Sequence, residues 1–189
     1  KTYSIPGRVS RDQIEAIRAA IAKSERPCIY AGGGIIAAGA AKELTEFAEK
    51  YDIPVVTTLM GVGAIPEDHP LSLKWLGMHG TYYANYAANE SDLLLAFGAR
   101  FDDRVTGSVE SFARDAKIVH VDIDQSEINK NVHADIGVVA DIREVLIELN
   151  KEPVRKERPV WKTAIRMWRN QHPLSYKKEP GVLKPQSVI

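Results

Sequence analysis

The sequence predicts an α/β fold: a three-layer, Rossmann-like parallel sheet with helices on both faces. The main observation is that short, continuously apolar segments alternate with segments of helical periodicity along most of the chain. Strands that are apolar throughout are typical of parallel sheets covered on both faces. A second observation is the composition: 189 residues, 44% hydrophobic and 26% charged, suffice for one globular domain with a sizeable core.

The alternation begins with a helix at residues 10–24. Its isoleucines recur at helical spacing, and Ser10 with Gln13 is expected to form a capping box at its start. Four further segments are expected in this half: a strand at 27–31, a helix at 38–51, a β-branched strand at 53–59, and an irregular stretch rich in Gly and Pro at 60–80.

The second half continues the same order, with a helix at 81–89, strands at 92–97, 117–123 and 138–139, and a closing helix at 142–149. Residues 151–159, KEPVRKERP, are charged and flanked by prolines, which indicates a linker. We expect an amphipathic helix at 161–168 and an extended tail from His172. The predicted organisation is a lead-in at 1–12, one domain at 13–150, and a linker with the start of a further domain at 151–189.

The composition excludes several classes of function. Lys+Arg and Asp+Glu balance at 25 each, so no global field favours nucleic acid or an anionic membrane surface. No apolar run approaches the roughly 18 residues of a membrane-spanning helix. Cys28, the single cysteine, lies in an apolar strand and is expected to be a buried thiol in a reducing compartment such as the cytoplasm. Neither paired histidine ligands nor a G-x-S-x-G nucleophile motif is found, so we expect no metal site and no catalytic residue.

Charged and glycine residues follow the predicted strands directly. The stretch LAFGARFDDRVTG at 95–107 runs from an apolar strand into Arg100, Asp102, Asp103 and Arg104. Ligands of open α/β sheets bind outside the carboxyl ends of the strands. We therefore expect four segments to meet at one edge of the sheet: residues 32–34, 57–58, 98–104 and 122–124.

Two interpretations of these segments stay open. In the first, one arginine donates two parallel hydrogen bonds to a phosphate while a neighbouring carboxylate orients the guanidinium. In the second, the charges form a surface cluster in which each ion pair contributes about 0 to 1 kcal/mol to stability. The glycines at 32–34 let a backbone approach a phosphate or ribose, or they form only a tight turn. His79, in a turn before a helix, is either a site residue or a local hydrogen-bonding group. Asp122, after a strand, is well placed to accept a ribose hydroxyl.

Three spaced motifs resemble the acetolactate synthase (acetohydroxyacid synthase) family, in its large catalytic subunits. They are LGMHG at 76–80 with AN at 84–85, FGARFDDRVTG at 97–107, and HVDID at 120–124 with EINK at 127–130. The resemblance covers the central domain and continues into HPLSY at 172–176 and KPQ at 184–186, which look like the start of the family's carboxyl-terminal thiamine domain.

The resemblance implies a thiamine-diphosphate enzyme that joins two 2-oxoacids in branched-chain amino-acid synthesis, with a DHS-like FAD/NAD-binding central domain. That domain would hold FAD, which does no net redox work, while thiamine diphosphate and Mg²⁺ belong to other domains. The residues implied to contact FAD are Gly32, Gly33, Gly34, Thr58, Leu59, Leu76, Met78, His79, Gly98, Ala99, Arg100, Asp102, Arg104, Val105, Asp122, Ile123, Asp141 and Ile142. Met78, Asp103 and Arg104 would also border the substrate channel.

The resemblance also implies what these 189 residues lack. The family's catalytic glutamate and its G-D-G…N motif for magnesium and diphosphate lie in other domains, so the chain alone is expected to be inactive. Implied partners are 2-oxoacids, other domains of the same chain and further copies of it, and a regulatory small subunit is a further candidate. The implied location is cytoplasmic, or plastidic in a plant. The alternatives are the middle domain of a sister thiamine enzyme, such as glyoxylate carboligase or pyruvate oxidase, and a stand-alone Rossmann-type nucleotide-binding module.

Overall fold

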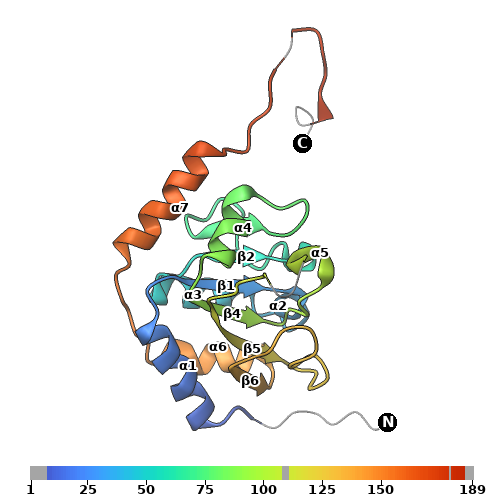
Figure 1. Ribbon diagram of the computed structural model, residues 1–189. Helices are drawn as coiled ribbons and strands as arrows, with labels where there is room; N and C mark the ends of the chain where they lie inside the picture. Colours follow the sequence, from blue (N-terminus) through green and yellow to red (C-terminus); the bar gives the residue numbers. More distant parts are fainter. Residues whose placement is uncertain (1–7, 108–110, 179, 186–189) are drawn as a thin grey trace.

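The computed structural model describes residues 8–107, 111–178 and 180–185. Within this part, six parallel strands form one sheet in the order β3-β2-β1-β4-β5-β6, with helices on both faces (Figure 1). The predicted fold class is therefore confirmed. The strands are β1 (Pro27–Ala31), β2 (Val55–Thr57), β3 (Ser72–Trp75), β4 (Leu93–Phe97), β5 (Lys117–Asp122) and β6 (Ile136–Val139).

The helices of the described residues are α1 (Arg11–Lys23), α2 (Gly33–Ala37), α3 (Ala41–Tyr51), the 3₁₀ helix η1 (Leu59–Gly61), α4 (Tyr82–Asn89), α5 (Asp103–Thr106), α6 (Ile142–Lys151) and α7 (Pro159–Gln171). Residues 1–7 of the predicted lead-in, and residues 179 and 186–189 of the predicted carboxyl-terminal segment, lie outside the described residues. No helix in the described ranges is both long and apolar enough to cross a membrane.

Local sequence signals explain the well-predicted helices. The capping box of α1 is confirmed: Ser10 N donates to Gln13 Oε1 at 3.0 Å, and Gln13 N donates to Ser10 Oγ at 3.2 Å. Thr81 caps α4 by accepting a hydrogen bond from Ala84 N at 3.1 Å. Asp141 caps α6 through Arg143 N at 2.8 Å. Each cap satisfies backbone donors that the first helical turn leaves unpaired.

The helix predicted at 38–51 is wrong at its start. The chain forms a short helix, α2, immediately after β1, turns at Gly39 with a positive φ of 61°, and only then begins α3 at Ala41. The sequence of α2, GGIIA, contains two glycines and two β-branched residues, which have low helix propensity. Its packing against β4, described below, holds this helix in place.

The stretch predicted as irregular at 60–80 contains the edge strand β3 and begins inside η1. β3 pairs with β2 through Val55↔Ser72 and Thr57↔Trp75, with a shift of register between these pairs. Its four residues show no clear alternation, and Lys74 has a positive φ of 64°, so the strand depends on its partner and leaves little signal in the sequence. β2 is also shorter than predicted, because Thr58 already caps η1.

The core has two layers, one on each face of the sheet. Alternate residues of β1 divide between them: Ile29 packs with α1, α3 and α6, whereas Tyr30 packs with α4 and α7. This division is the expected consequence of strand pleating. Buried side chains of both layers come from every part of the domain, so the chain has a core on each face of one continuous sheet.

The segment predicted as a linker ends in a buried arginine. Arg158 is 3% exposed, and its guanidinium donates to the carbonyl oxygens of Ile21 at 3.0 Å, Ser24 at 3.1 Å and Tyr51 at 3.3 Å. These carbonyls stand at the carboxyl ends of α1 and α3, beside the amino ends of the strands. The predicted amphipathic helix at 161–168 is confirmed within the longer α7, and Trp161 Nε1 donates to Pro27 O at 3.0 Å.

Candidate functional site

A cavity of about 670 Å³ lies at the carboxyl edge of the sheet, where β2, β1, β4 and β5 end. It is lined by Tyr30, Gly33, Gly34, Thr58, Leu59, Met60, Gly98, Ala99, Arg100, Asp102, Arg104, Val105, Asp122, Asp124 and Glu127. A smaller cavity of about 190 Å³ shares Gly34, Gly98 and Asp122 with it and is lined further by Ala37, Ala38, Ile123, Asp141 and Ile142. The predicted convergence of the four segments is thus observed.

The glycines of this edge allow two backbones to touch. A Cβ on Gly32 would meet Gly98 O at 2.1 Å, and one on Gly34 would meet Gly98 Cα at 2.6 Å. Gly98 itself has a positive φ of 59°, which disfavours other residues. The amides of Gly32 and Gly34 donate to Phe97 O and Gly98 O, at 2.9 and 3.0 Å. These two amides therefore hold α2 against β4, and the floor of the cavity is formed by this contact.

The charges after β4 divide between the cavity and solvent. Arg100, Asp102 and Arg104 line the cavity, whereas Asp103 does not. Asp102 caps α5 by accepting from Arg104 N at 3.1 Å; this hydrogen bond first, then Asp103 and the charges of Arg100 and Arg104, lower the pKa of Asp102. Asp103 and Arg104 form a loose pair, with Nε and Oδ1 3.8 Å apart, both largely exposed. Such a pair contributes little to stability.

Acidic side chains line the β5 end of the cavity. Asp122, 8% exposed, accepts one hydrogen bond from Asp124 N at 2.9 Å, and burial raises the pKa of its carboxyl. Glu127 Oε1 pairs with Lys130 Nζ at 2.8 Å. Its other oxygen, Oε2, is buried and has no hydrogen-bond partner among the described residues. This end of the cavity therefore presents acceptors that suit hydroxyl or amino donors.

The opposite end is apolar. Leu59 and Met60 of η1, both 73% exposed, line the cavity beside Thr58. The η1 turn is fixed by Thr58, whose Oγ1 accepts from Gly61 N at 3.0 Å, and a Cβ on Gly61 would meet Ala31 O at 2.4 Å. The cavity thus combines an apolar end at β2 with an acidic end at β5, and the charged segment after β4 lies between them.

The turn at 76–80 contacts the rim of the cavity and does not line it. Met78 N donates to Arg104 O at 3.1 Å, and Gly77 N donates to Asn85 Oδ1 at 2.8 Å. Leu76 is buried in the core at 4% exposure, whereas the Met78 side chain is 72% exposed. His79 contributes its carbonyl oxygen, which accepts from Trp75 Nε1 at 2.8 Å. His79 takes part in this hydrogen bond through its backbone, and the role of its imidazole toward a ligand stays a prediction.

The predicted site residues therefore fall into three groups. Those that line the larger cavity are Gly33, Gly34, Thr58, Leu59, Gly98, Ala99, Arg100, Asp102, Arg104, Val105 and Asp122. Those found only in the adjoining cavity are Ile123, Asp141 and Ile142. Those that line neither cavity are Gly32, Leu76, Met78, His79 and Asp103. Their roles toward a ligand stay predictions.

Three residues line the larger cavity that lay outside the segments expected at this edge: Tyr30, Met60 and Glu127. Asp124 was expected at this edge within residues 122–124, although it was not among the residues implied to contact FAD. Asp124 and Glu127 belong to the motif after β5, so their position after a strand was an available signal. Tyr30 lies inside an apolar strand, and its sequence neighbours gave no indication of a polar role. Among the described residues, no cluster of three or more His, Cys, Asp or Glu side chains forms a metal site.

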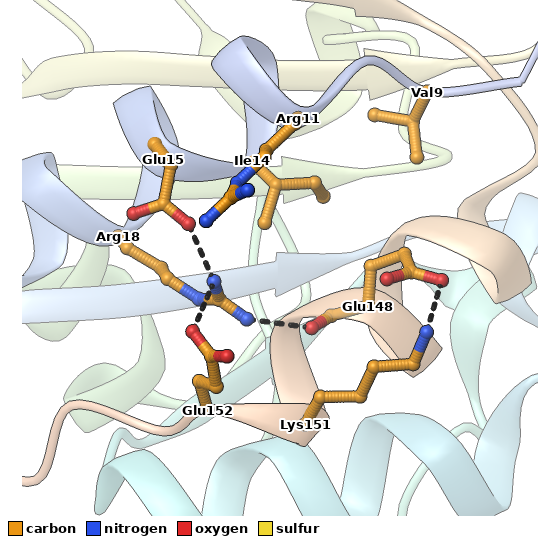
Figure 2. A pocket seen from close by; sticks show the side chains of 8 residues that line it. All are labelled: Val9, Arg11, Ile14, Glu15, Arg18, Glu148, Lys151 and Glu152. Atoms are coloured by element: carbon orange, nitrogen blue, oxygen red, sulfur yellow. Dashed lines mark hydrogen bonds and ion pairs between the residues drawn. The ribbon is translucent and has the colours of Figure 1, made fainter.

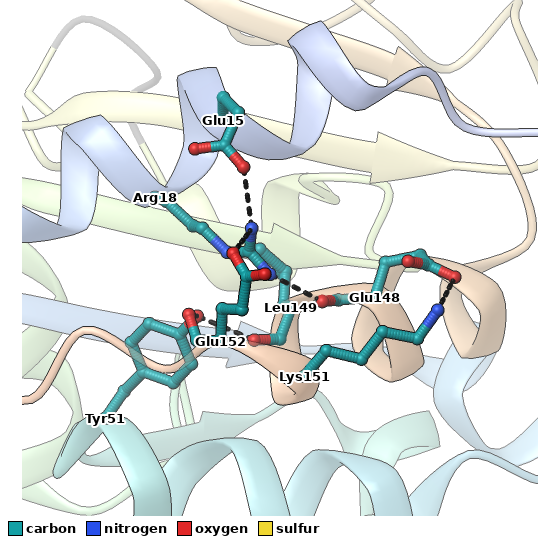
Figure 3. A network of polar contacts seen from close by, with 7 residues as sticks. All are labelled: Glu15, Arg18, Tyr51, Glu148, Leu149, Lys151 and Glu152. Carbon is teal, nitrogen blue, oxygen red and sulfur yellow. Dashed lines mark hydrogen bonds and ion pairs between the residues drawn. The ribbon is translucent and has the colours of Figure 1, made fainter.

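A separate cavity, of about 410 Å³, lies between α1 and α6 (Figure 2). Arg18 crosses its wall and pairs with Glu15 Oε1 at 2.6 Å, with Glu152 Oε2 at 3.3 Å and with Glu148 O at 2.7 Å. Figure 3 shows the same network together with Tyr51, whose hydroxyl donates to Leu149 O at 2.8 Å. These contacts join α1, α3 and α6, so we interpret the residues around this cavity as groups that hold the three helices together.

The fold and the larger cavity define the class of protein: an open, parallel α/β domain with a ligand cavity at the carboxyl edge of its sheet. Residues 14–149 match the family model described as "Thiamine pyrophosphate enzyme, central domain". The chain therefore belongs to the thiamine pyrophosphate enzyme family, as a central domain.

Relatives of known name agree with this assignment. The chain is 43% identical over 202 residues to "Acetolactate synthase 1, chloroplastic" of Zea mays, covering 100% of this chain and 31% of that protein. It is 58% identical over 137 residues to "Probable acetolactate synthase large subunit" of Methanocaldococcus jannaschii, covering 72% and 23%. With "Acetolactate synthase large subunit" of Buchnera aphidicola the identity is 42% over 194 residues, covering 100% and 34%. The resemblance to these large subunits is confirmed, and the chain spans about a third or less of their length.

Proposed function

We propose that the chain is the FAD-binding central domain of an acetolactate synthase. The observation that carries this proposal is the cavity across the ends of β2, β1, β4 and β5, apolar at one end and acidic at the other. A dinucleotide with a flat ring system and an adenosine needs such an elongated site. The names of the three relatives support acetolactate synthase over the sister thiamine enzymes and over a stand-alone nucleotide-binding module.

The residues of the cavity fit FAD chemically. Asp122 and Glu127 offer carboxylate oxygens to the hydroxyl groups of a ribose, as acids after a strand do in dinucleotide-binding folds. Arg100 and Arg104 offer guanidinium groups to a diphosphate, for which the planar arginine fork is well suited. Leu59 and Met60 provide apolar surface for the flavin ring. The buried, unpaired Oε2 of Glu127 is a further acceptor available to a ligand.

In this proposal the complete enzyme joins two 2-oxoacids, pyruvate with pyruvate or with 2-oxobutanoate, with loss of carbon dioxide. Bound FAD would supply no net redox chemistry, and the residues of this chain would hold and orient it. Thiamine diphosphate and Mg²⁺ would bind to other domains, and Met78, Asp103 and Arg104 would border the path of the substrate. We further propose the domain limits 13–150, a homo-oligomer, and a cytoplasmic or plastidic location. Residues 151–189 would be the linker and the start of the thiamine domain.

The test is a titration of the chain with FAD by flavin fluorescence, beside NADH and NADPH. We expect FAD to bind most tightly, and preference for a nicotinamide cofactor would refute the proposal. Arg100→Lys keeps the charge but loses the fork, so it should weaken FAD binding by about 1 to 3 kcal/mol, the range of a charge-assisted hydrogen bond. Arg114→Lys, outside the cavity, is the matched control, and equal affinity of the two variants would show that Arg100 is a surface charge.

The complete activity has its own test. The isolated chain should fold but produce no acetolactate from pyruvate with thiamine diphosphate and Mg²⁺. The reason is that the residues that act on thiamine are expected in other domains. FAD binding should be weak, since a ligand held by only one of several domains loses contacts, and about 3 kcal/mol of lost contacts weakens affinity roughly a hundredfold. Stoichiometric yellow protein would contradict the weak binding, and acetolactate above background would contradict the inactivity.

A further inference from the structure

Tyr30 combines complete burial with an unpaired hydroxyl in the wall of the larger cavity. The residue is 0% exposed, and its hydroxyl oxygen has no hydrogen-bond partner among the described residues. A buried phenol ordinarily finds a partner, because leaving the hydroxyl unpaired costs roughly 1 to 3 kcal/mol. Tyr30 is also one of the residues that line the cavity, so a ligand bound there is a candidate for the missing partner.

The surroundings of Tyr30 hold its ring firmly in place. The ring packs against Phe101 and Phe112, with centroids 5.4 and 6.5 Å away. In the sheet, Tyr30 is paired with Ala96 on one side and Val56 on the other, and neither side chain has a polar group. Burial first, and then the charge of Asp102, raise the pKa of the phenol, so it remains a neutral hydrogen-bond donor. Asp102, whose charge acts on the Tyr30 phenol, also lines the cavity.

A second buried tyrosine shows what a structural hydroxyl looks like in this protein. Tyr51 is also 0% exposed, but its hydroxyl donates to Leu149 O at 2.8 Å and lies 3.4 Å from Glu152 O (Figure 3). Its hydrogen bond is complete within the protein and joins α3 to the end of α6. The two tyrosines are thus matched in type and burial and differ in whether the protein itself supplies the partner.

We propose that the Tyr30 hydroxyl is a positioning group for the bound ligand, donating a hydrogen bond to an acceptor oxygen of the molecule in the larger cavity. Tyr30 lies on β1, between β2 at the apolar end of the cavity and β4 and β5 toward its acidic end. We therefore expect this hydrogen bond to reach the middle of the ligand. The proposal rests on the proposed function, because the ligand is taken to be FAD. It adds a role for a residue within a strand that is otherwise apolar.

The experiment compares Tyr30→Phe with Tyr51→Phe in the ligand-free chain and with FAD. Tyr30→Phe removes an unpaired hydroxyl, so the melting temperature without ligand should stay the same or rise, while the dissociation constant for FAD should increase roughly 3- to 10-fold. Tyr51→Phe should show the reverse pattern, a lower melting temperature and unchanged FAD affinity. Melting is followed by circular dichroism, and binding by flavin fluorescence.

The possible failures are distinct. Equal FAD affinity of Tyr30→Phe and the unsubstituted chain would overturn the role of Tyr30 and leave the proposed function intact. If Tyr30→Phe lowers the melting temperature as much as Tyr51→Phe does, its hydroxyl is paired within the ligand-free protein, which also overturns the inference. Absence of FAD binding by the unsubstituted chain would overturn the proposed function itself, and the inference with it.

Discussion

The two edges of the sheet hold their carboxylates in opposite ways. At the amino edge, Asp92 stands before β4 and accepts hydrogen bonds from Ser24 Oγ, from Glu25 N at 2.9 Å and from Arg26 N at 3.0 Å. Burial alone would raise the pKa of this carboxyl, but these bonds and the charge of Arg26 outweigh it, and the pKa is lowered. At the carboxyl edge, Asp122 ends β5 and accepts one hydrogen bond from within the described residues, from Asp124 N, and burial raises the pKa of its carboxyl.

The difference separates groups that stabilise the fold from groups that are available to a ligand. Arg158, Asp92 and Tyr51 find their partners within the protein, and all three join elements at or near the amino edge. Tyr30 and Glu127, in the wall of the carboxyl-edge cavity, each have one polar atom without a hydrogen-bond partner among the described residues. Unpaired buried groups cost free energy unless a ligand supplies the missing bond.

Arg158→Met should have the largest effect. The substitution leaves the carbonyls of Ile21, Ser24 and Tyr51 without the donor that now serves all three. We expect the free energy of unfolding to fall by roughly 3 to 5 kcal/mol, because each buried carbonyl that loses its donor costs about 1 to 3 kcal/mol. Denaturation by urea measures the loss. The control is Arg155→Met, at an exposed position of the same segment, which should change stability by less than about 0.5 kcal/mol. Equal effects of the two substitutions would show that the stability of the amino edge does not depend on the hydrogen bonds of Arg158.

Gly98→Ala tests the close contact beneath the cavity. Gly98 and Gly39 have similar positive φ values, 59° and 61°, but only a Cβ on Gly98 meets backbone, at 2.6 Å from Gly34 Cα. Gly39→Ala should therefore cost about 1 kcal/mol for the left-handed conformation alone. Gly98→Ala should cost roughly 1 to 3 kcal/mol more, because the two backbones must separate. The comparison is made by thermal unfolding, and indistinguishable losses would mean that the contact can relax.

The smallest effects come from the two aspartates and appear in their pH dependence. For Asp92 the lowered pKa means a contribution to stability that is complete above the ordinary value of 3.8 and is lost as the pH falls through the folded value. For Asp122 the raised pKa means the opposite: its contribution is complete below 3.8 and is lost as the pH rises through the folded value.

Asp92→Asn should accordingly lower stability at pH 7 by about 1 to 2 kcal/mol, a figure reduced for the partial exposure of the carboxylate. Asp122→Asn should be neutral or raise stability by up to about 1 kcal/mol at the same pH. Urea denaturation of both variants between pH 3 and pH 7 gives the two curves. If the stabilities of the two variants change with pH in the same way, the carboxylates at the two edges do not differ as proposed.

The sequence by itself determined the alternation of strands and helices along most of the chain. It also determined the edge of the sheet at which the charged segments meet. Continuous apolar runs marked β1, β4 and β5, and the capping box at Ser10 marked α1, because these signals depend on near neighbours only. The position of Arg100 and Asp122 after their strands was enough to bring them to one cavity, since the carboxyl ends of parallel strands share an edge.

The tertiary structure decided what depends on distant partners. β3 exists because β2 pairs with it, and α2 holds its shape because Gly34 rests on Gly98. Arg158 looked like one charge of a solvated linker, but three carbonyls from two other helices enclose it. Tyr30 looked like any strand residue, and only the three-dimensional packing brings it to a cavity wall with no partner for its hydroxyl in the described part of the chain. Hydrogen-bond satisfaction is a property of atoms far apart in sequence, so composition and periodicity do not reveal it.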